Sequence, residues 1–212
     1  HAPPSLILRL LAACPDAASQ PDSDGTLLPC HSLSGSHATS EMARPLEALL
    51  AAHPPSPEWS LRQLLMLGSA PGAEAAALAR LAAHGHEACE MDPIPPGLGV
   101  ETWYDRQRKH RRYPLHHAVA SAAPRAVVAE LVRLCPEAVR KQTWIGEYPL
   151  HLAARAAGAL FRGTYGPMLR RPRPAESVCA AAADAVELLL ETWPEAATAC
   201  DQLNMPLDAS AS

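Results

Sequence analysis

The chain has 212 residues, of which 22 are proline and 4% are aromatic, and its formal net charge is −4. So many prolines exclude a fold of long uninterrupted helices, because proline inside a helix removes a hydrogen bond and clashes with the preceding turn. No run of about eighteen apolar residues occurs, so a membrane span is not expected. The low aromatic content fits short, closely packed helices better than one large central core.

Two short motifs that return later first occur near the N-terminus. Apolar residues at 6–11 predict a helix, which has the character of a second helix that lacks its first. Cys-Pro-Asp-Ala-Ala follows at 14–18, and Leu-Pro-Cys-His-Ser-Leu occupies 28–33, with Pro29 and His31 at its key positions. Residues 1–53 are therefore assigned to repeats.

Residues 54–92 fit the same unit only loosely. Leucines between 61 and 67, followed by Leu78 and Leu81, give two apolar helical stripes. His-Glu-Ala at 86–88 stands where the earlier segment has Pro-Asp-Ala. We interpret 54–92 as a degenerate repeat.

An insertion is predicted over residues 93–112. It opens with three prolines within 93–96, continues with Trp103 and Tyr104, and ends in a basic run at 106–112. Prolines and glycines at this density forbid a regular helix over 92–99.

Residues 113–157 form the clearest unit. Pro-Leu-His-x-Ala at 114–118 returns at 149–153, and Pro-Glu-Ala at 136–138 returns at 194–196. Two different motifs that recur in the same order indicate a duplicated supersecondary unit.

The motif residues have physical reasons to be there. Pro114 and Pro149 stand at a first helical position, where the missing N–H would have no partner and the backbone angle is already helical. Leu115 and Leu150 are expected to point into the interior. Pro136 is expected to close the helix before it, because the residue preceding a proline is pushed out of the helical region.

A second insertion is predicted over 158–174, and it ends in Arg-Arg-Pro-Arg-Pro at 170–174. Residues 175–212 then hold a last repeat and a truncated unit that begins with Pro206 and Leu207.

A period near 35 residues that opens on Pro-Leu-His-x-Ala resembles the ankyrin repeat, a turn followed by two antiparallel helices. The resemblance implies a single all-α domain over 1–212, an ankyrin-type solenoid of about five stacked helix-turn-helix units with two loop insertions. It also implies that the motif histidines His31, His116 and His151 bind backbone groups near the turns and tie one repeat to another.

The resemblance further implies a protein-interaction module within a larger, intracellular polypeptide. No catalysis, cofactor or metal is expected, and the module is expected to be monomeric, with another protein bound on the concave surface of turns and first helices. The candidate contacts lie at a turn tip or in the first insertion. Most are aromatic residues or arginine, which are enriched at binding hot spots, and the others are their neighbours. The candidate contacts are Trp103, Tyr104, Arg106, Trp144, Ile145 and Glu147.

Charge supplies an alternative function. Residues 101–173 hold 14 of the 18 Lys and Arg but 5 of the 22 acids, whereas residues 174–212 hold 7 acids and no Lys or Arg. A basic middle between acidic ends favours nucleic acid or another polyanion as the alternative partner. Another alternative is a regulatory segment of an enzyme whose catalytic domain is absent from this chain.

Metal and thiol chemistry are not expected to be central. His84-x-His86-x-x-Cys89 has ligand types at a plausible spacing, but no second pair completes a four-ligand zinc site. The six cysteines show no paired spacing, which predicts reduced thiols in an intracellular protein.

Overall fold

The computed structural model describes residues 3–22, 27–34, 40–91, 112–143, 146–157 and 176–198. Within these ranges every regular element is helical and no strand occurs, which confirms the all-α class. Several predicted features lie outside the described residues: most of both insertions, and the positions Trp103, Tyr104, Arg106, Trp144, Ile145, Pro206 and Leu207.

The helices are short, as the proline content predicts. The α-helices are α1 (Pro4–Ala13), α2 (Ala43–Ala52), α3 (Leu61–Met66), α4 (Ala73–Ala83), α6 (Pro114–Ala120), α7 (Arg125–Leu134), α8 (Pro149–Ala156) and α9 (Glu176–Thr192). The 3-10 helices are η1 (Pro15–Ser19), η2 (Pro29–Leu33), η4 (Ser40–Met42), η5 (Gly85–Cys89), η6 (Pro136–Arg140) and η7 (Pro194–Thr198).

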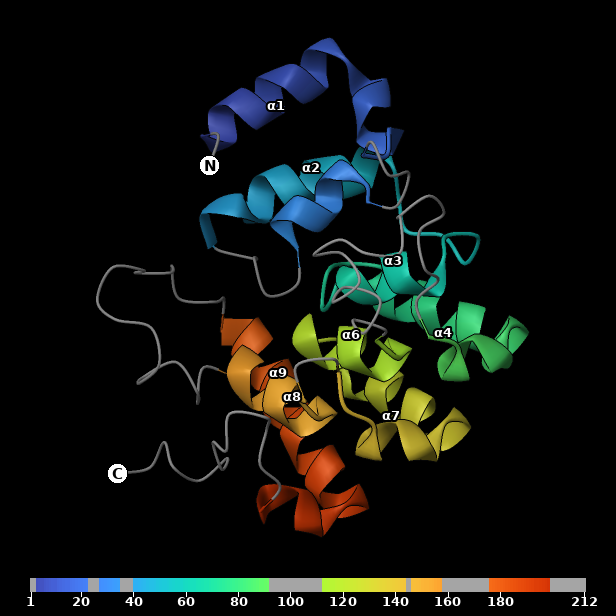
Figure 1. The fold of residues 1–212 in the computed structure, drawn as a ribbon. Helices are drawn as coiled ribbons and strands as arrows, with labels where there is room; N and C mark the ends of the chain where they lie inside the picture. Colours follow the sequence, from blue (N-terminus) through green and yellow to red (C-terminus); the bar gives the residue numbers. More distant parts are fainter. Residues whose placement is uncertain are drawn as a thin grey trace, which may run out of the picture.

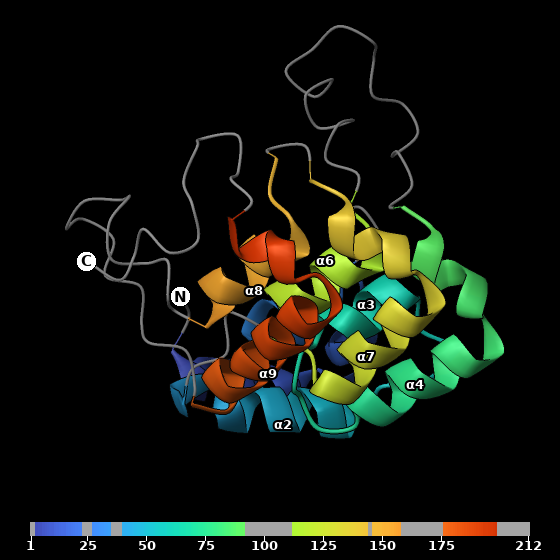
Figure 2. The same cartoon turned by 90° about the horizontal axis from the view of Figure 1, so that it is seen from below.

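Consecutive helices pair, and the pairs follow one another along the molecule in chain order (Figure 1). Helix α3 contacts α4, α6 contacts α7, and α8 contacts α9. The first helices of these pairs also contact one another in succession, α3 to α6 to α8, and the second helices do the same, α4 to α7 to α9. Figure 2 shows these two rows of helices from below, with α2 along the lower edge. The result is a layered stack.

Four helices end in the same backbone conformation. The capping residues Cys14, His53, His84 and Cys135 have φ between −143° and −134° and ψ between 51° and 86°. Proline follows three of them (His84 precedes a glycine), and a residue before proline is pushed out of the helical region. The prediction that Pro136 closes its helix is confirmed, because α7 ends at Leu134.

The structure adds a turn that the motif did not reveal. After three of those caps, and again after α9, the chain forms a five-residue 3-10 helix: η1, η5, η6 and η7. One alignment from the sequence needs correction, because η5 begins at Gly85 and not at His86. Gly85 therefore takes the place of Pro136, and a side chain there would approach the Leu134 methyl carbon to 3.3 Å.

Two predicted helices differ in length from the pattern. Residues 29–33 form only the 3-10 helix η2, so the second unit has a turn where a first helix was expected. Helix α9 has 17 residues, against 10 in α7. Its additional residues lie on the N-terminal side of the apolar residues at 185–190, whose spacing predicts a helix.

One apolar cluster extends through the pairs from Ala18 to Ala196. The motif leucines are buried as predicted, Leu115 with no exposed area and Leu150 with 4%. Because the described cysteines carry free thiols, these layers are held by packing and hydrogen bonds. None of the described helices combines the length and apolar character needed to span a bilayer.

Candidate functional site

His116 is buried in α6, and backbone groups bind both of its ring nitrogens. Nδ1 accepts the N–H of Tyr113 at 3.1 Å, and Nε2 lies 3.0 Å from the carbonyl oxygen of Lys141. A ring whose Nδ1 accepts and whose Nε2 donates is neutral. Burial, the largest cause, lowers the pKa of His116 to about 4. The ring ties the start of α6 to the chain that leads into α8.

His31 makes the same pair of bonds in the second unit. Its Nδ1 accepts the N–H of Leu28 at 2.8 Å, and its Nε2 lies 2.9 Å from the carbonyl oxygen of Gln63. Burial lowers the pKa of His31 as well. In α8, Nδ1 of His151 accepts the N–H of Tyr148 at 3.2 Å. The bond to the N–H at the helix start is present for all three motif histidines, and the predicted tie to a following segment is present for His31 and His116.

The degenerate unit uses different residues for the same turn. The N–H of Ser60 donates to the Gln63 side-chain oxygen at 3.1 Å, and the N–H of Gln63 donates to the Ser60 hydroxyl at 3.3 Å. This is a reciprocal capping box. Gln63 stands where the other units have histidine. The sequence analysis missed it, although Ser-x-x-Gln ahead of an apolar run is its recognised signal.

Glu147 was predicted to contact a partner from a turn tip, and the structure places it differently. Its residue is only 5% exposed, and its carboxylate forms an ion pair with Arg155 of α8. Its N–H also donates a hydrogen bond to the Thr143 hydroxyl oxygen at 3.2 Å. A carboxylate enclosed in this way holds the turn to α8 and does not reach a partner. Glu147 is therefore a structural residue.

A small aromatic patch lies where the turn before α8 meets the end of α9. The rings of Tyr148 and Trp193 cross at 74° with centroids 5.1 Å apart, and the Arg140 guanidinium lies 5.7 Å from the Trp193 centroid. Arginine over a tryptophan face is a favourable cation–π geometry. This contact is not foreseeable from the sequence, because Arg140 lies more than fifty positions before Trp193.

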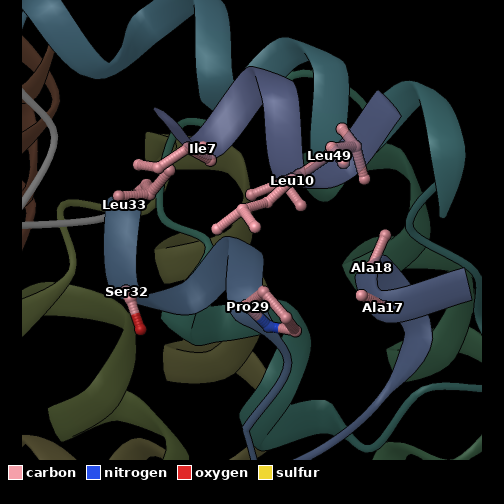
Figure 3. Close-up of a pocket in the computed structure, with 9 residues that line it drawn as sticks. Ile7, Leu10, Ala17, Ala18, Pro29, Ser32, Leu33 and Leu49 are labelled. Carbon is pink, nitrogen blue, oxygen red and sulfur yellow. The ribbon is translucent and has the colours of Figure 1, made fainter. Parts of the chain in front are cut away.

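A concavity among the described residues lies at the other end of the stack. It has a volume of about 300 Å³ and is bordered by α1, η1, η2 and α2. Figure 3 shows Ile7 and Leu10 of α1 across the opening from Leu33 and Pro29 of η2, with Leu49 on α2. Its lining is almost entirely apolar. The full set is Ile7, Leu10, Leu11, Ala17, Ala18, Pro29, Ser32, Leu33 and Leu49.

No family model, curated protein or solved structure matches this chain. Its functional assignment therefore rests on its own geometry.

Helix α1 differs from every later second helix in what covers it. It has no buried residue, and two of its leucines, Leu6 and Leu10, are 41% and 60% exposed. Helices α4, α7 and α9 each have a first helix packed beside them, and α1 has none among the described residues. We call the concavity and the exposed side of Leu10 the apolar end site.

The sequence contained part of the signal for this site. The apolar residues at 6–11 predicted the helix whose stripe borders the concavity. The predicted contacts were placed instead on turn tips and insertions, because those positions carry the aromatic and arginine residues. An apolar site at the end of a stack is invisible to a search for such residue types.

Chemically, the apolar end site offers hydrophobic contact and a single side-chain hydroxyl, that of Ser32. Burying a leucine-sized side chain in such a surface stabilises a complex by about 1.5–3 kcal/mol. The site therefore suits a complementary apolar surface.

Proposed function

We propose that this chain is an ankyrin-type protein-interaction module of a larger intracellular polypeptide, without catalytic activity of its own. Three features support the proposal: the repeated Pro-Leu-His-x-Ala motif, the layered helix pairs and the apolar end site. The observation that carries it is the concavity bordered by α1, η1, η2 and α2, which has an almost entirely apolar lining and beside which Leu10 is 60% exposed.

The position of the apolar end site suggests the shape of its occupant. First helices pack against the second helix of their own pair and against the next first helix. The cavity lies between α1, a second helix, and η2, which holds the first-helix position of the next unit. A short amphipathic helix from a partner protein would fill this place, with a leucine-sized side chain among Ile7, Leu11 and Leu33.

A peptide taken from this chain provides a defined probe. Residues 113–123 include the first helix α6 (Pro114–Ala120) and carry apolar side chains such as Leu115 and Val119. Fluorescence anisotropy of the labelled peptide should show saturable binding to the purified chain. Leu10→Asp should weaken that binding at least about tenfold, since it places a charge in the apolar contact.

Met91→Asp is the matched control, because Met91 is also an exposed apolar residue, at 39%, and lies outside the cavity lining. It should leave peptide binding unchanged. If the peptide does not bind, or if the two variants weaken binding equally, the apolar end site is not the interaction surface.

Nucleic acid remains the alternative partner because of the basic character of residues 101–173. Phosphate-driven affinity falls steeply with salt concentration, whereas apolar recognition does not. A salt titration with labelled DNA and RNA distinguishes the two functions.

A further inference from the structure

Two cysteines from neighbouring units meet at the junction of η5 and α7. Cys89 is the last residue of η5 and Cys135 caps the end of α7. The two sulfur atoms and a carboxylate oxygen of Glu137 all lie within 4.8 Å of one another. Cys89 and Glu137 are exposed, whereas Cys135 has no exposed area. One thiol is therefore open to solvent and the other lies directly behind it.

Hydrogen bonds hold this group in place. The Cys89 thiol lies 3.6 Å from the carbonyl oxygen of Leu134. A Glu137 carboxylate oxygen lies within 4.8 Å of both sulfur atoms. Burial raises the pKa of Cys135 to about 12, and the neighbouring Cys89 and Glu137 act in the same direction. The Cys135 thiol therefore lies beside a carboxylate that can accept its proton.

We propose that Cys89 and Cys135 form a peroxide-sensitive dithiol site that closes to a disulfide between two adjacent units. Exposure makes Cys89 the residue that meets the oxidant, a hydroperoxide, and proximity makes Cys135 the residue that resolves the product. Glu137 is the positioning residue that takes the proton from Cys135.

The chemistry balances in two steps. The Cys89 thiolate attacks a peroxide oxygen, the O–O bond breaks, and the departing hydroxide leaves as water once protonated, giving a sulfenic acid. The Cys135 sulfur then attacks the Cys89 sulfur while Glu137 accepts the Cys135 proton. The S–O bond breaks, and the second hydroxide also leaves as water. Two thiols and one hydroperoxide (H₂O₂) become one disulfide and two waters.

The bond would link two layers of the stack. Cys89 precedes the predicted insertion at 93–112, and Cys135 lies at the end of the second helix that follows it. A cross-link restricts the unfolded chain by closing the loop between its ends. The oxidised protein should therefore melt at a higher temperature than the reduced protein.

The experiment uses the purified, reduced chain with a metal chelator and stoichiometric hydrogen peroxide. Peptide mapping by mass spectrometry without reductant should find the Cys89–Cys135 link, and dithiothreitol should reverse it. Cys14→Ser is the matched control, since Cys14 is an exposed thiol outside this group. It should still form the link.

Two further variants separate the roles. Cys135→Ser should accumulate a Cys89 sulfenic acid that dimedone traps. Glu137→Gln should slow closure at least about tenfold, and this effect should exceed the change in the rate of Cys89 sulfenic acid formation, because the carboxylate lies near both sulfur atoms. A merely structural role of Glu137 would instead change both rates equally or neither.

Three results would overturn the proposal. Peroxide could oxidise both thiols without linking them, or link Cys89 only to other cysteines. Alternatively, Zn²⁺ added without chelator could bind tightly to the wild-type chain and not to Cys89→Ser or Cys135→Ser, which would assign the group to a metal.

Discussion

Single residues set the ends of the helices and the ties between units. The neutral ring of His116 satisfies a helix-start N–H and a carbonyl of the next segment at once. A protonated ring would place a second donor against the N–H of Tyr113. Acid should therefore act on the fold through this residue.

The first prediction concerns that acid sensitivity. The pKa of His116 is about 4 in the folded chain and about 6.5 in the unfolded chain, so the unfolded state binds a proton first as the pH falls. Neutral His116 therefore contributes about 3 kcal/mol to the free energy of unfolding. This contribution is complete above pH ~6.5 and is lost as the pH falls toward ~4. Urea unfolding at pH 7 and pH 4.5 measures the loss.

His116→Gln is the control for this prediction, because the amide keeps a donor and an acceptor but does not titrate. The variant should lose less stability than wild type between the two pH values, with His31 responsible for part of the remainder, since its pKa is lowered as well. Equal losses in both chains would show that His116 does not titrate with folding.

The second prediction concerns the capping box of the degenerate unit. Ser60→Ala removes the acceptor of the Gln63 N–H, and loss of a serine N-cap costs about 1 kcal/mol of folding stability. Ser56→Ala is the comparison, because the Ser56 hydroxyl accepts an N–H outside any helix start. Thermal unfolding should show a larger decrease in melting temperature for Ser60→Ala than for Ser56→Ala. An equal decrease would show that the cap does not stabilise the helix.

At the scale of elements, the sequence predicted that the helices are short and that prolines mark their ends. It did not predict the length of each helix. Pro114 and Pro149 each begin a helix as predicted, because their effect on the backbone is local. The shortness of η2 and the length of α9 depend on which neighbours pack against them, and no local motif encodes that.

The sites show the same division between local and distant signals. Histidine hydrogen bonds were predictable from a motif that repeats. The burial of Glu147 depends on Arg155 in the following helix. The approach of Cys89 to Cys135 depends on the stacking of two units whose spacing the insertion interrupts. Contacts of this kind appear only when the layers are assembled.

The third prediction belongs to the element scale and concerns the interior of a helix pair. Leu150→Ala removes a side chain that is 4% exposed and should cost about 2–5 kcal/mol. Leu6→Ala, at a leucine that is 41% exposed, should cost much less. Denaturant unfolding compares the two, and similar costs would place Leu150 outside the packed interior.

At the scale of the whole molecule, the layers matter because each contacts mainly its neighbours. Contacts follow α3 to α6 to α8 and α4 to α7 to α9. In such an arrangement stability is close to a sum of unit and interface contributions. A change at one end of the stack should therefore have little effect on the stability of the other end.

Native-state hydrogen exchange of Leu150→Ala tests this claim most directly. A stack predicts faster exchange in α6 to α9 and little change in α1 and α2, which lie at the far end (Figure 1). Faster exchange to the same degree in all helices would contradict it and would indicate one cooperative core.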